Sequence, residues 1–173
     1  LYKHRFVHAF PAFQFTREEW KEMTDDFISK MTDSVIDVAI AQLPASSRAI
    51  RGAALATTMK KRRDQLPAAM DRYYGFYNQV VDLRLSDKNE QVLLKDAPGG
   101  GLHLTVRKIN KDGAVKGKLV DRVYDPHITS EIRLYMGAGN DTILVDHTNS
   151  RIKLRMIGGK GDKHIDVTQS GPG

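Results

Sequence analysis

Three oxygen-bearing side chains lie at two glycine-rich turns, and their chemistry suits a calcium ion. Asn140 and Asp141 end the turn in MGAGNDTIL at 136–144, and Asp162 lies in the turn GGKGD at 158–162. Glycine permits backbone conformations that point carbonyl oxygens inward, and calcium takes about six to eight oxygen ligands from carboxylates, amides and carbonyls. The turns therefore predict Asp141, Asn140 and Asp162 as ligands of a calcium ion. No other cofactor is expected.

A metal-free tight turn would require the same glycines. Lys163 follows Asp162 in the second turn, and a lysine ammonium would repel a calcium ion. A single good turn also supplies fewer oxygens than calcium prefers. Two hypotheses stay open: calcium orders the turns between 137 and 166, or the glycines only bend the chain.

The composition indicates a folded, mildly basic chain without thiol chemistry. Its 173 residues are enough for one domain or two small ones, and 40% of them are hydrophobic. The net charge is +6, from 27 basic and 21 acidic residues that are interleaved along the chain. No motif of a nucleic-acid-binding class is present, so no specific nucleic-acid partner is expected. The absence of cysteine excludes disulfides, thiolate metal sites and cysteine catalysis.

No membrane-spanning helix and no signal peptide at the start of the sequence are expected. No apolar run approaches the roughly 20 residues needed to cross a bilayer, and LYKHRFVHAF at the start lacks a signal-peptide core. The opening Leu1 and the closing SGPG lead us to expect a fragment of a longer polypeptide.

The first half has helical periodicity. Thr16 and Glu19 have the spacing of a capping box, which satisfies the free amides at a helix start. An apolar stripe follows at spacings of three and four residues, formed by Trp20, Met23, Phe27 and Met31. The Leu66–Pro67 step is expected to separate the third helix from the fourth. Four helices are predicted, over 16–31, 33–43, 46–66 and 67–84.

After about Leu83 the period changes to two, because Val and Ile alternate with polar residues between Gly- and Asp-containing turns. The predicted strands are 91–95, 102–109, 115–124, 131–136, 141–146, 151–157 and 163–168. A hairpin turn is expected at Asp112-Gly113.

The fold class predicted from this change is α+β. A helical bundle over 1–85 is followed over 86–173 by an antiparallel sheet or a short, solenoid-like β-roll. The two halves are expected to pack as one unit, because each has an apolar face to cover.

The glycine turns also repeat. GNDTILV from Gly139 and GDKHIDV from Gly161 match at glycine, isoleucine and valine, 22 residues apart. Three explanations stay open: one coil of a solenoid, a short parallel stack of strands, or two similar turns in an ordinary sheet.

The first of these turns resembles the calcium nonapeptide of RTX β-rolls, whose pattern is G-G-x-G-x-D-x-U-x with U a large apolar residue. The matching positions are Gly137, Gly139, Asp141 and Ile143, while Met136 replaces the first glycine. In the second copy Lys163 stands at the carboxylate position and Asp162 is displaced by one. The resemblance implies an RTX-like glycine turn that binds calcium.

A wider resemblance covers most of the chain. LPASSRAIRGAALATTMKKRRDQLPAAMDRYYGFYNQVVDLRLSDKNEQ, YDPHITSEIRLYMGAGNDTILV and IKLRMIGGKGD are similar to a region of large outer-membrane proteins of the BamA/TamA surface-antigen class, especially those of Bacteroidetes type. The residues that carry it best are KRRDQLP at 61–67, Tyr73-Tyr74, Val81-Asp82, Asp87, EIRLY at 131–135 and GND at 139–141.

In that class the region lies between a calcineurin-like metallophosphoesterase domain and a C-terminal barrel. The resemblance therefore implies a connecting module in the bacterial cell envelope, periplasmic or associated with the outer membrane. Its partners would be other domains of the same polypeptide or other envelope proteins, and it would reach the membrane only through the parent chain. The phosphoesterase motifs D-x-H and G-N-H-[DE] are absent here.

No catalytic or cofactor-binding residue stands out, and the fragment itself is not expected to be an enzyme. KKRRD at 60–64 is interpreted as a solvated helix face, and YYGFY at 73–77 as core packing. His4 and His8 have helical spacing without an accompanying carboxylate, while His147 and His164 adjoin the two glycine turns.

The predicted function is a non-catalytic structural or interaction module. The alternatives are a calcium-stabilised binding domain and an accessory domain that shapes access to a neighbouring metallophosphoesterase.

Overall fold

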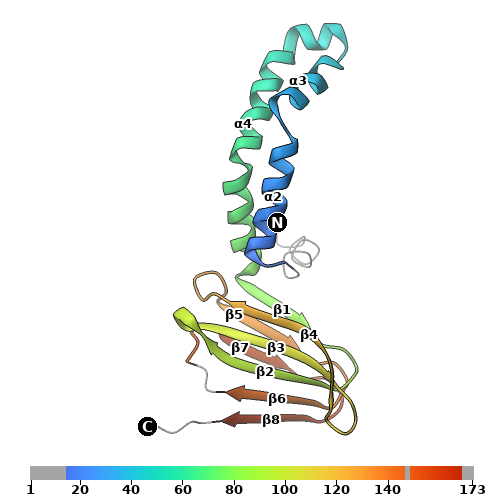
Figure 1. Ribbon diagram of the computed structural model, residues 1–173, viewed down its shortest axis with the longest axis vertical. Helices are drawn as coiled ribbons and strands as arrows, with labels where there is room; N and C mark the ends of the chain where they lie inside the picture. The colour runs from blue at the N-terminus through green and yellow to red at the C-terminus, as the bar shows by residue number, and fades with distance from the viewer. Residues whose placement is uncertain (1–14, 147–148, 169–173) are drawn as a thin grey trace. The chain divides into compact units, whose positions relative to one another are not determined.

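The computed structural model describes residues 15–146 and 149–168. The chain forms two compact units, the first ending at Tyr77 and the second beginning at Asn78. Within the described residues the first unit contains three α-helices and the second contains eight β-strands in two sheets (Figure 1). The α+β class is therefore confirmed, and the boundary between the units falls at 77/78 where domains of 1–85 and 86–173 were expected.

Helix α2, Arg17–Lys30, begins at the predicted capping box. The side chain of Thr16 accepts a hydrogen bond from the amide of Glu19 at 3.2 Å, and the Glu19 carboxylate accepts one from the Thr16 amide at 2.7 Å. Because both interactions satisfy amides that lack a partner within the helix, the start of α2 is fixed by local sequence.

The buried stripe of α2 differs from the predicted one by one position. Met23 and Phe27 are 45% and 47% exposed, whereas Thr24 is buried and Ile28 is half-buried. The rotation of the helix is set by Trp20, whose ring stacks on Tyr73 with centroids 5.8 Å apart and whose indole N–H donates to the carbonyl of Met70 at 3.1 Å. Positions four residues apart from Trp20 therefore face α4.

Helix α3, Asp33–Ala41, is held by its cap and by α4. Thr32 caps it by accepting from the amide of Val35, and Ile36 is its fully buried residue. Arg63 of α4 donates to the carbonyl of Met31 at 3.0 Å and to Asp33 at 2.7 Å. Arg63 is only 15% exposed, so the interpretation of 60–64 as a solvated face is wrong at this residue.

Helix α4, Ala45–Asn78, is one helix of 34 residues, so the predicted break at Pro67 does not occur. Proline removes the amide that would donate to the carbonyl of Arg63, a loss that usually ends or kinks a helix. Here tertiary contacts hold both sides: Arg63 binds the corner between α2 and α3, and Asp71 forms an ion pair with Arg17 at 2.7 Å. None of the described helices is long and apolar enough to span a membrane.

Strand β1, Val80–Arg84, was predicted as the end of the last helix, and that prediction is wrong. The stretch VVDLR has an apolar residue at three of five positions, so its period is ambiguous between helix and strand. Val81 is fully buried in the strand, where a β-branched side chain is favoured.

The second unit is organised around three strand–turn–strand units. Each consists of two strands joined by a five-residue turn, and we refer to them as rungs. The first rung joins β1 to β2 (Glu90–Ala97), the second joins β5 (Glu131–Tyr135) to β6 (Asp141–Asp146), and the third joins β7 (Lys153–Ile157) to β8 (Lys163–Thr168). Figure 1 shows the three turns, at 85–89, 136–140 and 158–162, gathered at one end of the unit.

The rungs stack in parallel with one register in both sheets. Val81 pairs with Ile132 and Val92 pairs with Ile143, so the first and second rungs are offset by 51 residues on both sides of the turn. Ile132 pairs with Leu154 and Ile143 with Ile165, so the offset to the third rung is 22 residues. Of the three explanations for the 22-residue repeat, a short parallel stack is the one observed.

The longer first offset accommodates a hairpin. Strands β3 (Gly101–Ile109) and β4 (Val115–Tyr124) extend the larger sheet beyond β2, in the order β4-β3-β2-β6-β8. The predicted turn at Asp112-Gly113 is confirmed: Gly113 has a φ of 81°, and the side chain of Asn110 accepts from the amides of Asp112 and Ala114.

The core of this unit is formed by alternate residues of the rungs and the hairpin. The apolar ones with an exposed fraction of 1% or less are Val81, Val92, Leu94, Leu104, Val106, Ile132, Leu134 and Ile143. Because strand side chains alternate between faces, the constant register aligns these residues in columns from rung to rung.

We predict that Gly159→Ala destabilises the chain while the neighbouring Gly158→Ala does not. A Cβ at Gly159 would lie well inside 3.0 Å of the Gly137 carbonyl, whereas one at Gly158 would meet nothing within 4 Å. The overlap is with backbone, which cannot rotate away, so a loss of about 1–3 kcal/mol is expected. Urea unfolding of the two variants measures the difference. Equal stabilities would show that the turns are not packed as described.

Candidate functional site

The three turns are joined by a ladder of side-chain hydrogen bonds. The side-chain oxygen of Asn89 accepts from the amide of Asn140 at 3.0 Å, and the side-chain oxygen of Asn140 accepts from the amide of Asp162 at 3.0 Å. These three residues occupy the last position of their turns, so each rung is bound to the next by the same contact. Asp87 adds a second bond between the first two turns, accepting from the amide of Ala138 at 3.1 Å.

The residues that follow the ladder form a buried column of charge. Glu90, Asp141 and Lys163 are the first strand residues after the three turns, and the register places them side by side. The side chain of Asp141 is completely buried, and one of its oxygens accepts from the amide of Glu90 at 2.9 Å. Its other oxygen, Oδ2, lies 3.1 Å from the ammonium of Lys163. The interior of the stack therefore contains two acids and one base.

The ammonium of Lys163 occupies a cradle of oxygen atoms. It donates to the carbonyl of Gly139 and to that of Lys160, the latter at 2.9 Å, in addition to its ion pair with Asp141. Two backbone carbonyls from glycine turns and a carboxylate are the types of oxygen that bind a hard cation. In this protein they bind a cation that is covalently part of the chain.

Burial raises the pKa of Glu90, and the negative charge of Asp141 adds to the effect. Ser86 opposes it, since its amide and hydroxyl both donate to one carboxyl oxygen of Glu90. The second oxygen of Glu90 is buried without a hydrogen-bond partner in the described structure. A proton on Glu90 would remove the negative charge that burial disfavours.

The predicted calcium ligands lie close together but are engaged in different interactions. Asp141 has both oxygens committed, to Glu90 and to Lys163. Asn140 binds the adjacent rungs, and Asp162 is exposed at the end of the ladder. No group of three or more His, Asp or Glu residues arranged to hold a metal ion is found among the described residues.

Two site residues were not predicted from the sequence. Glu90 gave no signal by itself, because a glutamate after a turn is commonplace. Lys163 was noted only as a residue that would repel calcium. Placing Asn89, Asn140 and Asp162 in one column would have aligned Glu90, Asp141 and Lys163 and revealed both.

A second polar cluster lies on the hairpin. The carboxylate of Asp121 binds Lys118, the Nε2 atom of His103 at 2.7 Å and the hydroxyl of Thr105 at 3.2 Å. These contacts, with Lys118 the strongest, hold the pKa of Asp121 well below its usual range. The Thr105 hydroxyl binds the acid and not the imidazole, so the order of groups differs from that of a hydrolytic triad.

The remaining histidines do not converge within the described structure. His164 lies exposed on β8, and His127 donates its amide to Asp125 at 2.8 Å in a local turn. His4, His8 and His147 lie outside the described residues.

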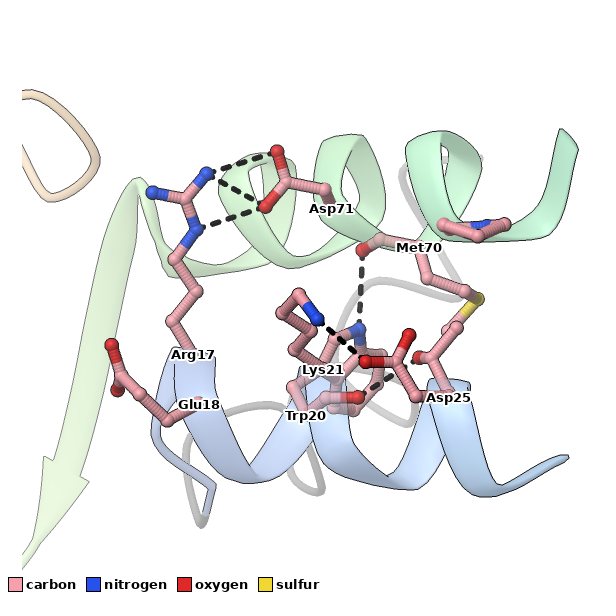
Figure 2. Close-up of a pocket in the computed structure, with 9 residues that line it drawn as sticks. Arg17, Glu18, Trp20, Lys21, Asp25, Met70 and Asp71 are labelled. Atoms are coloured by element: carbon pink, nitrogen blue, oxygen red, sulfur yellow. Dashed lines mark hydrogen bonds and ion pairs between the residues drawn. The ribbon is translucent and has the colours of Figure 1, made fainter. Parts of the chain in front are cut away.

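A groove of about 450 Å³ lies between α2 and α4 (Figure 2). Its walls are Arg17, Glu18, Trp20, Lys21, Thr24, Asp25, Pro67, Met70 and Asp71. Figure 2 shows two ion pairs in its walls: Arg17 forks onto Asp71, with the Nε–Oδ1 pair at 2.9 Å, and Lys21 pairs with Asp25 at 2.5 Å. The groove is therefore part of the packing interface between the two helices, and its described lining residues include no activated nucleophile.

Comparisons with known proteins found no relative for this chain. No family model matches it, and searches of curated proteins and of solved structures gave no significant match. Its function is consequently inferred from the geometry of the stack and from the resemblances in the sequence.

We predict that Lys163→Met destabilises the stack far more than Lys160→Met. The first change removes the cation that faces the buried carboxylate of Asp141, and breaking such a pair costs about 3–5 kcal/mol. The side chain of Lys160 is exposed, and its carbonyl is retained in the variant. Chemical unfolding at neutral pH measures both. A loss below about 1 kcal/mol for Lys163→Met would show that the ammonium is not needed to compensate Asp141.

We also predict that Glu90→Gln removes part of the pH dependence of stability. Because the folded pKa of Glu90 is raised, the folded state retains a proton that the unfolded chain releases. Its stabilising contribution is thus complete below the usual pKa near 4.5 and is lost as the pH rises through the folded value. The substituted amide keeps an oxygen that accepts from Ser86 and carries no titrating charge.

Unfolding curves between about pH 5 and pH 8 test this linkage. Relative to the parent, Glu90→Gln should gain stability as the pH rises. Glu18→Gln, at an exposed position of α2, serves as the control and should follow the parent curve. Parallel curves for Glu90→Gln and the parent would contradict the assignment.

Proposed function

We propose that this chain is a non-catalytic structural and interaction module of a bacterial envelope protein, built from a helical unit and a short β-roll. The observation that carries the proposal is that the polar side chains at the three turns contact one another across the rungs. Asn89, Asn140 and Asp162 bind rung to rung, and Asp141 is enclosed by Glu90 and Lys163. These side chains serve cohesion of the stack.

The chemistry of the buried column supports a structural role. A catalytic acid or base must reach the proton that it transfers, at about 2.6–3.2 Å or through one water. Glu90 has an exposed fraction of 0%, and the Asp141 side chain is equally enclosed. Neither carboxyl group is open to a substrate in this conformation.

The envelope location and the partners follow from the resemblance to the BamA/TamA class. The module would lie on the periplasmic side or at the outer membrane, connected to other domains of the same polypeptide or to envelope proteins. In such a chain it would separate a metallophosphoesterase domain from the membrane-embedded part, and an accessory role in access to that enzyme is a further proposal of the same origin.

A calcium-stabilised binding domain is the second candidate, and one observation favours it. The carbonyl of Gly139, the carbonyl of Lys160 and the carboxylate of Asp141 converge on one positive charge. Calcium and the ammonium of Lys163 would compete for these oxygens. The tethered ammonium loses side-chain rotamer freedom but no translational freedom when it binds, so the structural module is the better supported of the two.

We predict that calcium leaves the thermal midpoint of the chain unchanged within about 1 °C. Because Lys163 already neutralises Asp141, added calcium has little charge left to bind. Melting curves in millimolar calcium and in chelator measure the shift. A shift that Asp141→Ala abolishes would favour the calcium-binding domain.

The same preparation tests the absence of catalysis. A generic phosphomonoester should not be hydrolysed above the buffer rate, with or without added divalent metal. Turnover by the chain itself that survives repeated purification would overturn the structural assignment.

A further inference from the structure

The third rung leaves one end of the stack open. In the described residues no strand pairs with the outer edge of β7 or β8. Met156, Ile165 and Val167 are 37%, 47% and 55% exposed there, whereas two of their partners on the second rung, Leu134 and Ile143, are 0% and 1% exposed. Stacked architectures normally end in a polar cap, because an uncovered end exposes core side chains and free backbone groups.

The turns show what a further rung would need. A Cβ at Gly137 would overlap the carbonyl of Ser86, and one at Gly139 would overlap that of Lys88. Gly159 and Gly161 meet the second turn in the same way. The first turn has Ser86 and Lys88 at these two positions, and no rung precedes it in the described structure. Glycine therefore occupies the second and fourth turn positions where another rung lies behind, and at Gly137 and Gly161 a positive φ favours it as well.

We propose that the open end formed by β7 and β8 binds a strand–turn–strand segment of a partner polypeptide, which adds as a fourth rung. This inference rests on the proposed interaction module and names its binding surface. The segment would pair with both edges and cover Met156, Ile165 and Val167 with apolar residues at alternate positions. Its five-residue turn would carry glycine at the second and fourth positions, as the second and third turns do.

Charge complementarity selects an acidic segment. The stretch from Arg151 to Asp166 contains five lysines and arginines against two aspartates. At the open edge, Lys153 pairs with Glu131 and Arg155 pairs with Arg133 in the strand register, so the two outer members of the Arg155 column are both basic. Glu131 forms ion pairs with both Arg133 and Arg155, each at 3.0 Å. An acidic side chain on the partner strand would lie next to Arg155 and compensate this charge.

Asp162 provides a further attachment point. Asn89 and Asn140 each accept the amide of the same position in the next turn, and Asp162 is the third member of that ladder. Its exposed carboxylate has the same accepting capacity, so it can bind the amide of a fourth turn.

A second copy of this chain does not fit as the fourth rung in a head-to-tail arrangement. Its first turn would place the side chains of Ser86 and Lys88 where glycine is required. Its β2 already pairs with β3 on that side, so only β1 has a free edge in the described first rung. The partner must therefore differ from the first rung in sequence.

A synthetic peptide tests the proposal on the full chain. The probe is a copy of residues 151–168 in which Lys153→Glu and Arg155→Glu supply the acidic face, and Lys163→Asp places a carboxylate next to Lys163 of the chain. The matched control peptide also carries alanine at the positions of Gly159 and Gly161. We expect the glycine peptide to bind and the alanine peptide to bind at least about tenfold more weakly, because its turn would clash with the third turn. Fluorescence anisotropy measures both affinities.

Variants of the chain locate the binding surface. Ile165→Lys places a charge on the exposed apolar end and should abolish binding, while Val123→Lys, on a 59% exposed position of β4, should not. Asp162→Ala should weaken binding but should not abolish it as Ile165→Lys does. Circular dichroism confirms that each variant is folded.

Equal affinity for the two peptides, binding unaffected by Ile165→Lys, or no binding to the full chain would overturn the proposal. Concentration-dependent dimers that Ile165→Lys disrupts would assign the surface to a second copy and likewise reject it. If the peptide does not bind, the outcomes of the calcium and phosphomonoester experiments are unaffected. The docking surface can therefore be rejected without rejecting the structural role.

Discussion

The constraint on which the β unit depends is that the register is the same on both sides of each turn. An offset of 51 residues joins the first two rungs in both sheets, and an offset of 22 joins the second to the third. Because no residue is gained or lost within a turn, the turns themselves must stack. Backbone then approaches backbone, which leaves space only for glycine at some positions and aligns Asn89, Asn140 and Asp162 at another. The ladder and the glycines are consequences of one geometric requirement.

The same alignment explains why charge is buried next to the turns. The first strand residue after each of the three turns lies in the core, and these residues form the column Glu90, Asp141 and Lys163. Two acids in contact would oppose folding, so one side chain of opposite charge and one raised pKa compensate them. A buried ionic column costs more than an apolar one of equal volume, but it defines a single register, since a slip by one residue would leave Asp141 without its partner.

Most elements could be predicted where a local signal determines them. The capping box at Thr16, the hairpin at Gly113 and the strands after Leu102 are set by neighbouring residues, and the structure has them as expected. The helix at Pro67 was not predictable in this way, because contacts of Arg17 and Arg63, distant in sequence, keep it continuous. The second strand of the first rung was predicted over 91–95, but β1 was missed. The rung was not recognised because it has no rung behind it and so lacks the glycines that mark the other two. At the site, Asp141 was recognised from its turn, but the role of Lys163 depends on a strand pairing that its own neighbourhood does not encode.

Helix α4 has a mechanical consequence. Its 34 residues make a rod about 50 Å long, with one missing amide donor at Pro67. Helix α2 contacts the rod on both sides of that gap, through Met31 near Arg63 and through Arg17 at Asp71. Trp20 adds a third contact, since its indole N–H donates to the carbonyl of Met70. The short helix therefore braces the long one on both sides of the turn that lacks a backbone hydrogen bond, which keeps the rod continuous through its proline.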